Sequence, residues 1–250
     1  MKNLIIILLA IILLGNLKNI NFEFVSKAKN LIEKIYKSTG KQNADNNSGK
    51  SQKSGNDENN YQEYYFRNYS FCKKFKGKSY RFEYNFKFRK TDYQFYHQIS
   101  KNHELNYYTQ EFKNNEYLDA IVNQLESDAK ELKLSRNELA ELTVAFVQNC
   151  IKYKISPSKF PIESLIEGTA DCKGKSVILA KLLQKEGFGT KLLLFPYHMT
   201  AAISVSADSN YTYYDIDGDR YTIIESTEPG WRIGQFPPDI DNAEGSMDVL

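Results

Sequence analysis

Aromatic side chains recur at every second position between residues 79 and 89, and only an extended strand places such a series on one face. Arginine, glutamate, asparagine and lysine stand between them, and the series itself is Tyr80, Phe82, Tyr84, Phe86 and Phe88. A second aromatic-rich stretch, residues 64–75, comes first, and Gly77 lies in the break between the two. The pattern predicts a β-hairpin or small sheet with one apolar face. It belongs to an aromatic-rich β segment expected over residues 61–116, which also includes Tyr93–Tyr96 and Tyr107–Tyr108.

Aromatic side chains interleaved with basic ones are also typical of surfaces on which single-stranded nucleic acid stacks. The overall charge argues against that alternative, because 33 Lys and Arg side chains are set against 31 Asp and Glu. Such a balance gives no general attraction to phosphate, and no nucleic-acid partner is expected. The hydrophobic content of 41% in 250 residues is that of a globular protein and excludes a large multidomain machine.

The chain opens with Lys2 and an unbroken apolar run from Leu4 to Leu14. A spanning helix needs about 20 apolar residues, so the run is closer to the hydrophobic region of a signal peptide. No small-x-small cleavage site follows, so an uncleaved membrane anchor fits the run as well as a signal peptide does. A buried core helix is the weaker alternative. Residues 1–21 are therefore expected to be a signal peptide or N-terminal membrane anchor, which makes the protein membrane-anchored or secreted.

The next segments are expected to connect this leader to the folded part. Residues 22–37 carry apolar side chains at helical spacing and predict an amphipathic juxtamembrane helix. Residues 38–60 contain almost nothing apolar and predict a disordered tether. At the other end of the chain, residues 241–250 are expected to form a flexible tail.

Two core helices are expected between residues 117 and 151, the first part of a catalytic core over residues 117–240. The first helix has one apolar stripe, formed by Leu118, Ile121, Val122, Leu125 and Ala129. The second begins after Ser135, which stands three residues before Glu138 with the spacing of a capping box.

A further helix is expected to begin at Asp171 or Cys172, because aspartate is a good N-cap, an apolar face follows, and Gly187 supplies a stop. Cys172 then lies in the first turn. There the helix dipole favours the thiolate, which lowers the pKa of the thiol and makes the sulfur a nucleophile. Backbone amides at the same helix end are suited to receive an oxyanion.

A histidine and an acid follow this cysteine in an order suited to nucleophilic catalysis. His198 opens a strand directly after the predicted strand 191–195 and a turn. Glu225 lies near the end of the last strand of a hairpin that turns at Asp217-Gly218. A nucleophile, a base and a group that orients the base are the three roles of a thiol or serine triad.

The segments around these residues resemble the transglutaminase-like superfamily of papain-type cysteine enzymes. The resemblance is strongest to a microbial subgroup with a Tyr-Pro-x-Glu-Thr-Leu…Gly-Asp-Cys-Glu-Asp signature, and it runs from about residue 66 to residue 238. The matching stretches are Phe160–Leu165, Asp171–Gly174, His198–Ala201 and Ile224–Trp231. The resemblance implies an α+β fold in which the nucleophile helix packs on an antiparallel β-sheet, preceded here by the aromatic-rich β segment.

Carried over position by position, the resemblance makes Cys172 the nucleophile, His198 the general base and acid, and Glu225 the residue that orients the imidazole. Many relatives have aspartate in place of Glu225, and Lys173-Gly174 replaces an acidic pair. In some relatives an aromatic residue upstream of the cysteine donates to the oxyanion. The one tryptophan here, Trp231, leaves that role unfilled; Gln148 is the candidate substitute, and the alternative for Gln148 is a solvated helix residue.

The remaining candidates for chemistry are expected to be structural. Three cysteines without a C-x-x-C spacing support neither a disulfide framework nor a zinc ribbon, and Cys72 and Cys150 are expected to be buried small hydrophobes. His97 and His103 are expected at the surface, in a loop-like stretch. Alternating acids at residues 215–219 are better explained by a turn than by a calcium loop. No cofactor or metal is expected.

The sequence thus predicts an exported thiol enzyme that transfers the acyl group of a peptide or protein amide. Water as acceptor gives peptidase or amidase activity, and an amine acceptor gives cross-linking. The alternatives are a catalytically silent module that binds a peptide or protein partner on the same fold, and a structural envelope protein that uses the fold as a spacer.

Overall fold

The computed structural model describes residues 63–98, 116–205, 212–237 and 248–249. The leader, juxtamembrane helix and tether predicted over residues 1–60 lie outside the described residues, as do His103 and Tyr107–Tyr108. None of the helices in the described ranges is long and apolar enough to cross a membrane.

The aromatic series forms the predicted β-hairpin. β1 (Tyr64–Phe75) and β2 (Lys78–Arg89) pair antiparallel along their whole length. The two turn residues, Lys76 and Gly77, have φ angles of 49° and 81°, as a type I′ turn requires. One face of the hairpin buries aromatic rings, whereas Cys72 lies on the other face and is exposed. The prediction that Cys72 is buried is therefore wrong, because neighbours in a strand point to opposite faces.

A helix, α4 (Lys90–Gln98), directly follows the hairpin. The prediction of β structure up to residue 116 is wrong at these residues, because the aromatic side chains there have helical rather than alternating spacing. Tyr93 stacks on His97 one turn later at 5.3 Å between ring centroids, and Tyr96 packs on Phe160 at 5.0 Å. The His97 side chain is 60% exposed, at the surface as expected but on a helix rather than a loop.

α6 (Glu116–Glu131) and α7 (Arg136–Cys150) form the two predicted core helices, and every member of the predicted α6 stripe is buried. α7 begins with the predicted capping box. The Glu138 backbone N–H donates to Ser135 Oγ at 3.3 Å, and the Ser135 backbone N–H donates to the Glu138 carboxylate at 2.8 Å. Two N–H groups at this helix end are thereby paired.

Replacement of Ser135 by alanine is expected to lower the free energy of unfolding by about 1 kcal/mol, because it removes the cap acceptor and leaves the Glu138 N–H without it. Urea unfolding followed by circular dichroism measures this change. The matched control is Ser70→Ala, at an exposed position of β1, for which a change within about 0.5 kcal/mol is expected. Equal losses in the two variants would contradict a capping role for Ser135.

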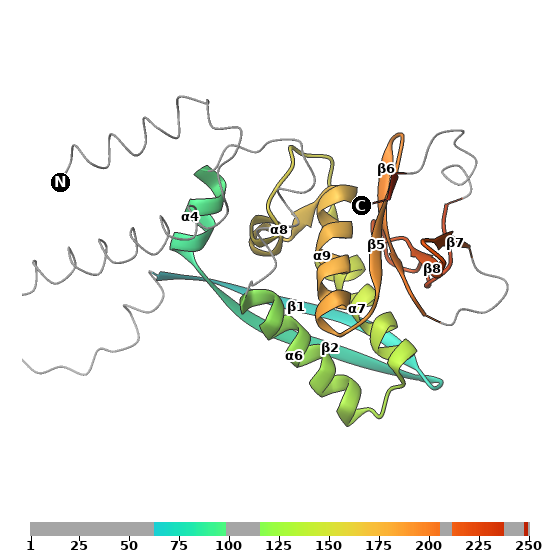
Figure 1. Cartoon of the computed structure of the whole chain (residues 1–250). Helices are drawn as coiled ribbons and strands as arrows, with labels where there is room; N and C mark the ends of the chain where they lie inside the picture. The colour runs from blue at the N-terminus through green and yellow to red at the C-terminus, as the bar shows by residue number, and fades with distance from the viewer. Residues whose placement is uncertain (1–62, 99–115, 206–211, 238–247, 250) are drawn as a thin grey trace, which may run out of the picture. The chain divides into compact units, whose positions relative to one another are not determined.

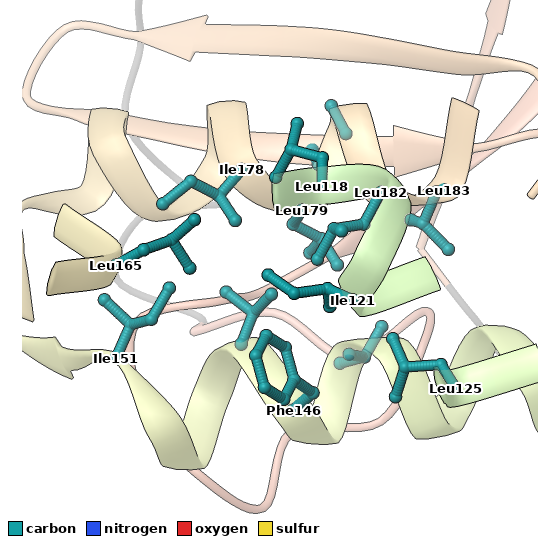
Figure 2. Close-up of a cluster of buried hydrophobic side chains, with 14 of the residues drawn as sticks. Leu118, Ile121, Leu125, Phe146, Ile151, Leu165, Ile178, Leu179, Leu182 and Leu183 are labelled. Carbon is teal, nitrogen blue, oxygen red and sulfur yellow. The ribbon is translucent and has the colours of Figure 1, made fainter. Parts of the chain in front are cut away.

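The hairpin and the helices share one hydrophobic core. α7 packs on β1, α6 packs on β2, and both helices also contact α9 (Cys172–Lys185) (Figure 1). Phe146 of α7 is fully buried and contacts aromatic rings of the hairpin. Figure 2 shows it in a cluster whose other members come from α6, α9 and neighbouring segments, among them Leu118, Ile121, Leu125, Ile178, Leu179 and Leu182. The predicted boundary at residue 116 therefore does not separate two cores.

Short elements connect α7 to α9. β3 (Lys152–Tyr153) pairs parallel with β4 (Thr169–Ala170), and α8 (Pro161–Glu167) lies between them in sequence. Two hydrogen bonds hold the pair, from the Lys152 N–H to the Gly168 carbonyl at 2.9 Å and from the Lys154 N–H to the Ala170 carbonyl at 2.8 Å. The exit of α7 is thus fixed beside the entry to α9.

α9 packs against an antiparallel sheet of five strands in the order β7-β8-β6-β5-β9 (Figure 1). The chain is therefore α+β, as predicted. The strands are β5 (Thr190–Phe195), β6 (His198–Ile203), β7 (Tyr213–Ile216), β8 (Asp219–Ile224) and β9 (Asp248–Val249).

Two predictions about the sheet have clear outcomes. The predicted hairpin turn at Asp217-Gly218 is confirmed, with φ angles of 54° and 88°. Two of the acids around it form ion pairs, Asp215 with Arg220 and Asp217 with Lys191, each at 3.2 Å. In the tail that was predicted to be flexible, residues 248–249 instead pair with Leu193 and Leu194 of β5. An edge strand offers unpaired backbone groups, and β9 uses those of β5; the rest of residues 241–250 lies outside the described residues.

Candidate active site

Cys172 is the first residue of α9, as predicted, and Asp171 is the N-cap. The Asp171 carboxylate accepts a hydrogen bond from the Gly174 backbone N–H at 2.8 Å. A Cβ at Gly174 would lie 3.0 Å from Ala170 Cβ and 3.2 Å from Asp171 Oδ1, so a larger residue would crowd the cap. The cap and the close approach fix the backbone on which the thiol is held.

His198 is the first residue of β6, and this register brings it to Glu225. β6 pairs with β8, with Ala201 opposite Ile224, so the residue that follows β8 lies beside the start of β6. His198 Nε2 and Glu225 Oε2 are 2.7 Å apart. This contact leaves Nδ1 as the ring nitrogen available to the thiol, and His198 and Cys172 lie close enough for each to shift the pKa of the other.

Glu225 is fully buried and held at both carboxylate oxygens. Oε2 faces His198, and Oε1 accepts hydrogen bonds from the Thr227 backbone N–H and from Thr227 Oγ1, each at 2.6 Å. Burial opposes the charged form, but the bonds to His198 and Thr227 lower the pKa of Glu225 below its ordinary value. The carboxylate is therefore ionised at neutral pH, with a fixed orientation.

The charges of Cys172 and His198 depend on each other. Burial alone would raise the pKa of the Cys172 thiol, yet the hydrogen bond with His198, the Met199 backbone N–H and the charge on His198 together lower it. Burial alone would lower the pKa of His198, yet the bonds to Cys172 and Glu225 raise it to about 9. Opposite shifts of this kind favour a thiolate–imidazolium pair at neutral pH. The three residues predicted from sequence are thus brought together.

Gln148 has neither of the two roles expected for it. It is 4% exposed, so it is not a solvated helix residue. Its Nε2 donates to the Glu225 carbonyl at 2.7 Å and to the Trp231 carbonyl at 3.0 Å. These bonds use both hydrogens of the amide, so the predicted donation to an oxyanion is wrong in this arrangement. Gln148 instead holds the backbone of Glu225.

Lys175 is a residue of this region that the sequence analysis missed. It is fully buried on α9, one turn beyond Cys172, and its ammonium donates to the backbone carbonyls of Gln148 and Thr227. The signal was present in the spacing, because Lys175 stands three, four and seven residues before Ile178, Leu179 and Leu182. A helix places residues so spaced on one face, and these three are buried.

Two exposed aromatic side chains adjoin the site. Tyr197 directly precedes His198 and is 98% exposed, and Tyr153 of β3 is 42% exposed. Partial burial and the nearby groups Cys172, Asp171 and Glu225 raise the pKa of Tyr153, which places its phenol within electrostatic range of the thiol. Neither tyrosine was singled out by sequence spacing.

The surroundings of Cys150, the remaining cysteine, make its thiol unreactive. Cys150 lies at the end of α7, half-buried against the core, as broadly expected. Burial raises its pKa to about 12, against an opposing effect of Lys175.

In the described part of the chain, one group of side chains has the composition of a metal site: His97, Glu163 and Glu167. These atoms are already paired within the protein. His97 Nδ1 is 2.9 Å from Glu163 Oε1, Lys159 Nζ is 2.8 Å from Glu167 Oε2, and the Tyr93 hydroxyl donates to Glu167 Oε1 at 2.9 Å. The group joins α4 to α8, and the ammonium in it opposes a cation.

Comparisons with protein-family models, with curated proteins and with solved structures found no match to this chain.

Proposed function

We propose that this protein is an exported thiol enzyme with a transglutaminase-like core that transfers the acyl group of a peptide or protein amide. One observation carries the proposal: His198 Nε2 lies 2.7 Å from Oε2 of buried Glu225, and His198 and Cys172 are close enough for each to shift the pKa of the other. The placement of the thiol in the first turn of a helix that packs on an antiparallel sheet supports it further. The N-terminal segment would hold the enzyme at the membrane or direct its secretion.

In the first half of the reaction, the Cys172 thiolate attacks the carbonyl carbon of the amide and a C–S bond forms. Backbone N–H groups in the first turn of α9 are suited to the charge that develops on oxygen. The imidazolium of His198 gives its proton to the amide nitrogen, the C–N bond breaks and an amine leaves. Glu225 stabilises the imidazolium and keeps the ring oriented.

In the second half, the thioester is attacked by an acceptor. His198 takes a proton from water or from an amine as the new bond to the acyl carbon forms, the C–S bond breaks, and the thiolate is regenerated. Water gives a peptidase or amidase, and a lysine-like amine gives a cross-linking enzyme. Both outcomes use the same three side chains.

The proposal is tested by the pH dependence of alkylation of the full chain with iodoacetamide. An ordinary thiol with a pKa of about 8.5 is about 0.3% ionised at pH 6, whereas a thiolate held by an imidazolium is mostly ionised. A less basic thiolate is also a weaker nucleophile, so we expect Cys172 to react about tenfold faster than an ordinary thiol at pH 6. The advantage disappears by about pH 7, because the ionised fraction of an ordinary thiol rises tenfold with each pH unit below its pKa whereas that of Cys172 is already near its maximum.

His198→Ala removes the partner of the thiol and is expected to abolish this advantage, so that Cys172 in the variant follows the pH profile of an ordinary thiol. His97→Ala is the matched control, because it removes the other histidine that lies within the described ranges, and it should leave the Cys172 profile unchanged. Trypsin separates the three cysteines into different peptides, so mass spectrometry gives each rate in one sample.

The other two cysteines provide internal references. Cys72 is exposed and stands for an ordinary thiol, and Cys150 is half-buried, so that its alkylation reports unfolding. If Cys172 reacts no faster than Cys72 at low pH and is indifferent to His198, the enzyme proposal fails. The catalytically silent binding module then becomes the better account of the fold.

A further inference from the structure

A buried ammonium lies beside the candidate active site, and all three of its N–H groups have backbone acceptors. Lys175 Nζ donates to the carbonyls of Gln148 at 3.3 Å and Ile151 at 2.5 Å, both at the C-terminal end of α7. It also donates to the Thr227 carbonyl at 2.9 Å, in the segment that follows β8. One side chain of α9 thus joins the end of α7 to the segment that carries Glu225.

The burial of a charge at this position is costly, and an apolar side chain could fill the same space. An ammonium taken out of water loses its hydration, and an apolar side chain of similar size would pack there without that loss. Burial lowers the pKa of Lys175 to about 8, although Glu225, Cys150 and Glu228 act in the opposite direction. The charge is therefore retained against a penalty, which points to a use beyond packing.

The contacts of Lys175 continue to the thiol. Thr227, whose carbonyl accepts from Lys175, donates twice to Glu225 Oε1, and Glu225 Oε2 contacts His198 Nε2. His198 in turn interacts electrostatically with Cys172. Because Lys175 and Cys172 lie one turn apart on α9, the series begins and ends on the same rigid element.

The charges of the series also balance. A thiolate at Cys172 and a carboxylate at Glu225 are two negative charges, and an imidazolium at His198 is one positive charge. Lys175 supplies the second positive charge, and Glu225 is the foremost charged group acting on it. Without Lys175, a largely buried site would hold a net negative charge, a state that disfavours the thiolate.

We propose that Lys175 is a positioning residue of the candidate active site: its ammonium fastens the Glu225–Thr227 segment to α7 and α9, and through Glu225 it sets the orientation and charge of His198. The inference rests on the proposed function, because it assigns Lys175 to the same thiol chemistry. Lys175 acts through other residues and does not touch the reacting atoms.

The test compares full-length Lys175→Met with the parent by the alkylation profile of Cys172 with iodoacetamide. We expect the low-pH limb of the profile, over which the Cys172 thiolate becomes protonated, to move up by about one pH unit, which makes Cys172 about tenfold slower at any pH on that limb. Lys181→Met is the matched control, because it removes an ammonium from the same helix two turns further on, and its profile should coincide with that of the parent. A merely structural Lys175 would change stability without moving the profile.

The outcomes separate this inference from the proposed function. A parent in which Cys172 behaves as an ordinary thiol overturns both. If Cys172 in the parent reacts faster than an ordinary thiol at low pH, and its alkylation profile in Lys175→Met is the same as in the parent, the positioning role alone is overturned. If Lys175→Met does not fold, as reported by rapid alkylation of Cys150, then Thr227→Val decides: it removes one donor to Glu225 in the same series, and an unshifted Cys172 profile in that variant overturns the proposal.

Discussion

Replacement of Glu225 by glutamine is expected to slow alkylation of Cys172 at pH 6 about tenfold or more, even though the change is nearly isosteric. Thr227 donates two hydrogen bonds to Oε1, so the amide oxygen of the variant would occupy that side. Its NH₂ group would then face His198 Nε2 and require that nitrogen to be an acceptor. The imidazolium is thereby disfavoured.

The direction of this effect follows from the shifts in the parent. The bond to Glu225 is one of the causes that raise the pKa of His198 to about 9. Without the carboxylate, and with an amide NH₂ group facing Nε2, the pKa of His198 is expected to fall well below its ordinary value of about 6.5, so that the ring is largely neutral at pH 6. Above that pH the ring is neutral and no longer stabilises the thiolate, so the pKa of Cys172 rises. Alkylation at Cys172 and an NMR titration of the His198 ring measure the two changes separately.

Glu228→Gln is the control for the charge change, because Glu228 is exposed, lies three residues further on and is also a charged neighbour of Lys175. A change in alkylation rate within about twofold is expected there. Should His198 in Glu225→Gln still titrate near the value of the parent, the carboxylate is not what holds the proton on the ring, and the assignment of Glu225 is wrong.

Replacement of Phe146 by alanine is expected to lower the free energy of unfolding by about 3–5 kcal/mol. The ring is fully buried, and its centroid lies 5.4 Å from Tyr69, 5.9 Å from Tyr84 and 6.4 Å from Phe71. The variant loses the transfer free energy of the ring and these aromatic contacts, and it leaves a cavity where the hairpin meets α7. Domains of ordinary size unfold with about 5–15 kcal/mol, so the loss is a large share of the total.

Urea unfolding followed by circular dichroism measures this loss. Phe66→Ala is the matched control, because the same atoms are removed from an outer position of β1 at which the side chain is 47% exposed. A change within about 1 kcal/mol is expected there. Similar losses in the two variants would contradict the view that one core is shared by the hairpin and the helices.

The elements that could be predicted from sequence are those with a local signal. Alternating aromatics indicate β2, the Asp217-Gly218 pair indicates a hairpin turn, and the Ser135 and Asp171 caps indicate where two helices begin. Cys172, His198 and Glu225 were chosen as a site from their order in the chain together with the resemblance of the segments around them.

The partners of these residues could not be predicted, because each contact joins distant parts of the chain. Gln148 bonds to carbonyls 77 and 83 residues later, and nothing near Gln148 in the sequence indicates which ones. Lys175 is different, because its place on a buried helical face is visible in the spacing. α4 was missed because its aromatic residues, taken as a continuation of the hairpin, have the spacing of a helix.

The position of the hairpin at the start of the described fold has a consequence during synthesis. β1 and β2 leave the ribosome before α6 and α7 exist to cover their aromatic face, and a two-stranded hairpin by itself is only marginally stable in water. Its rings remain uncovered until the chain has grown past residue 150, the end of α7. Since chains grow at about 5–20 residues per second, this interval lasts seconds, and the nascent chain is then most exposed to aggregation or to capture by a chaperone.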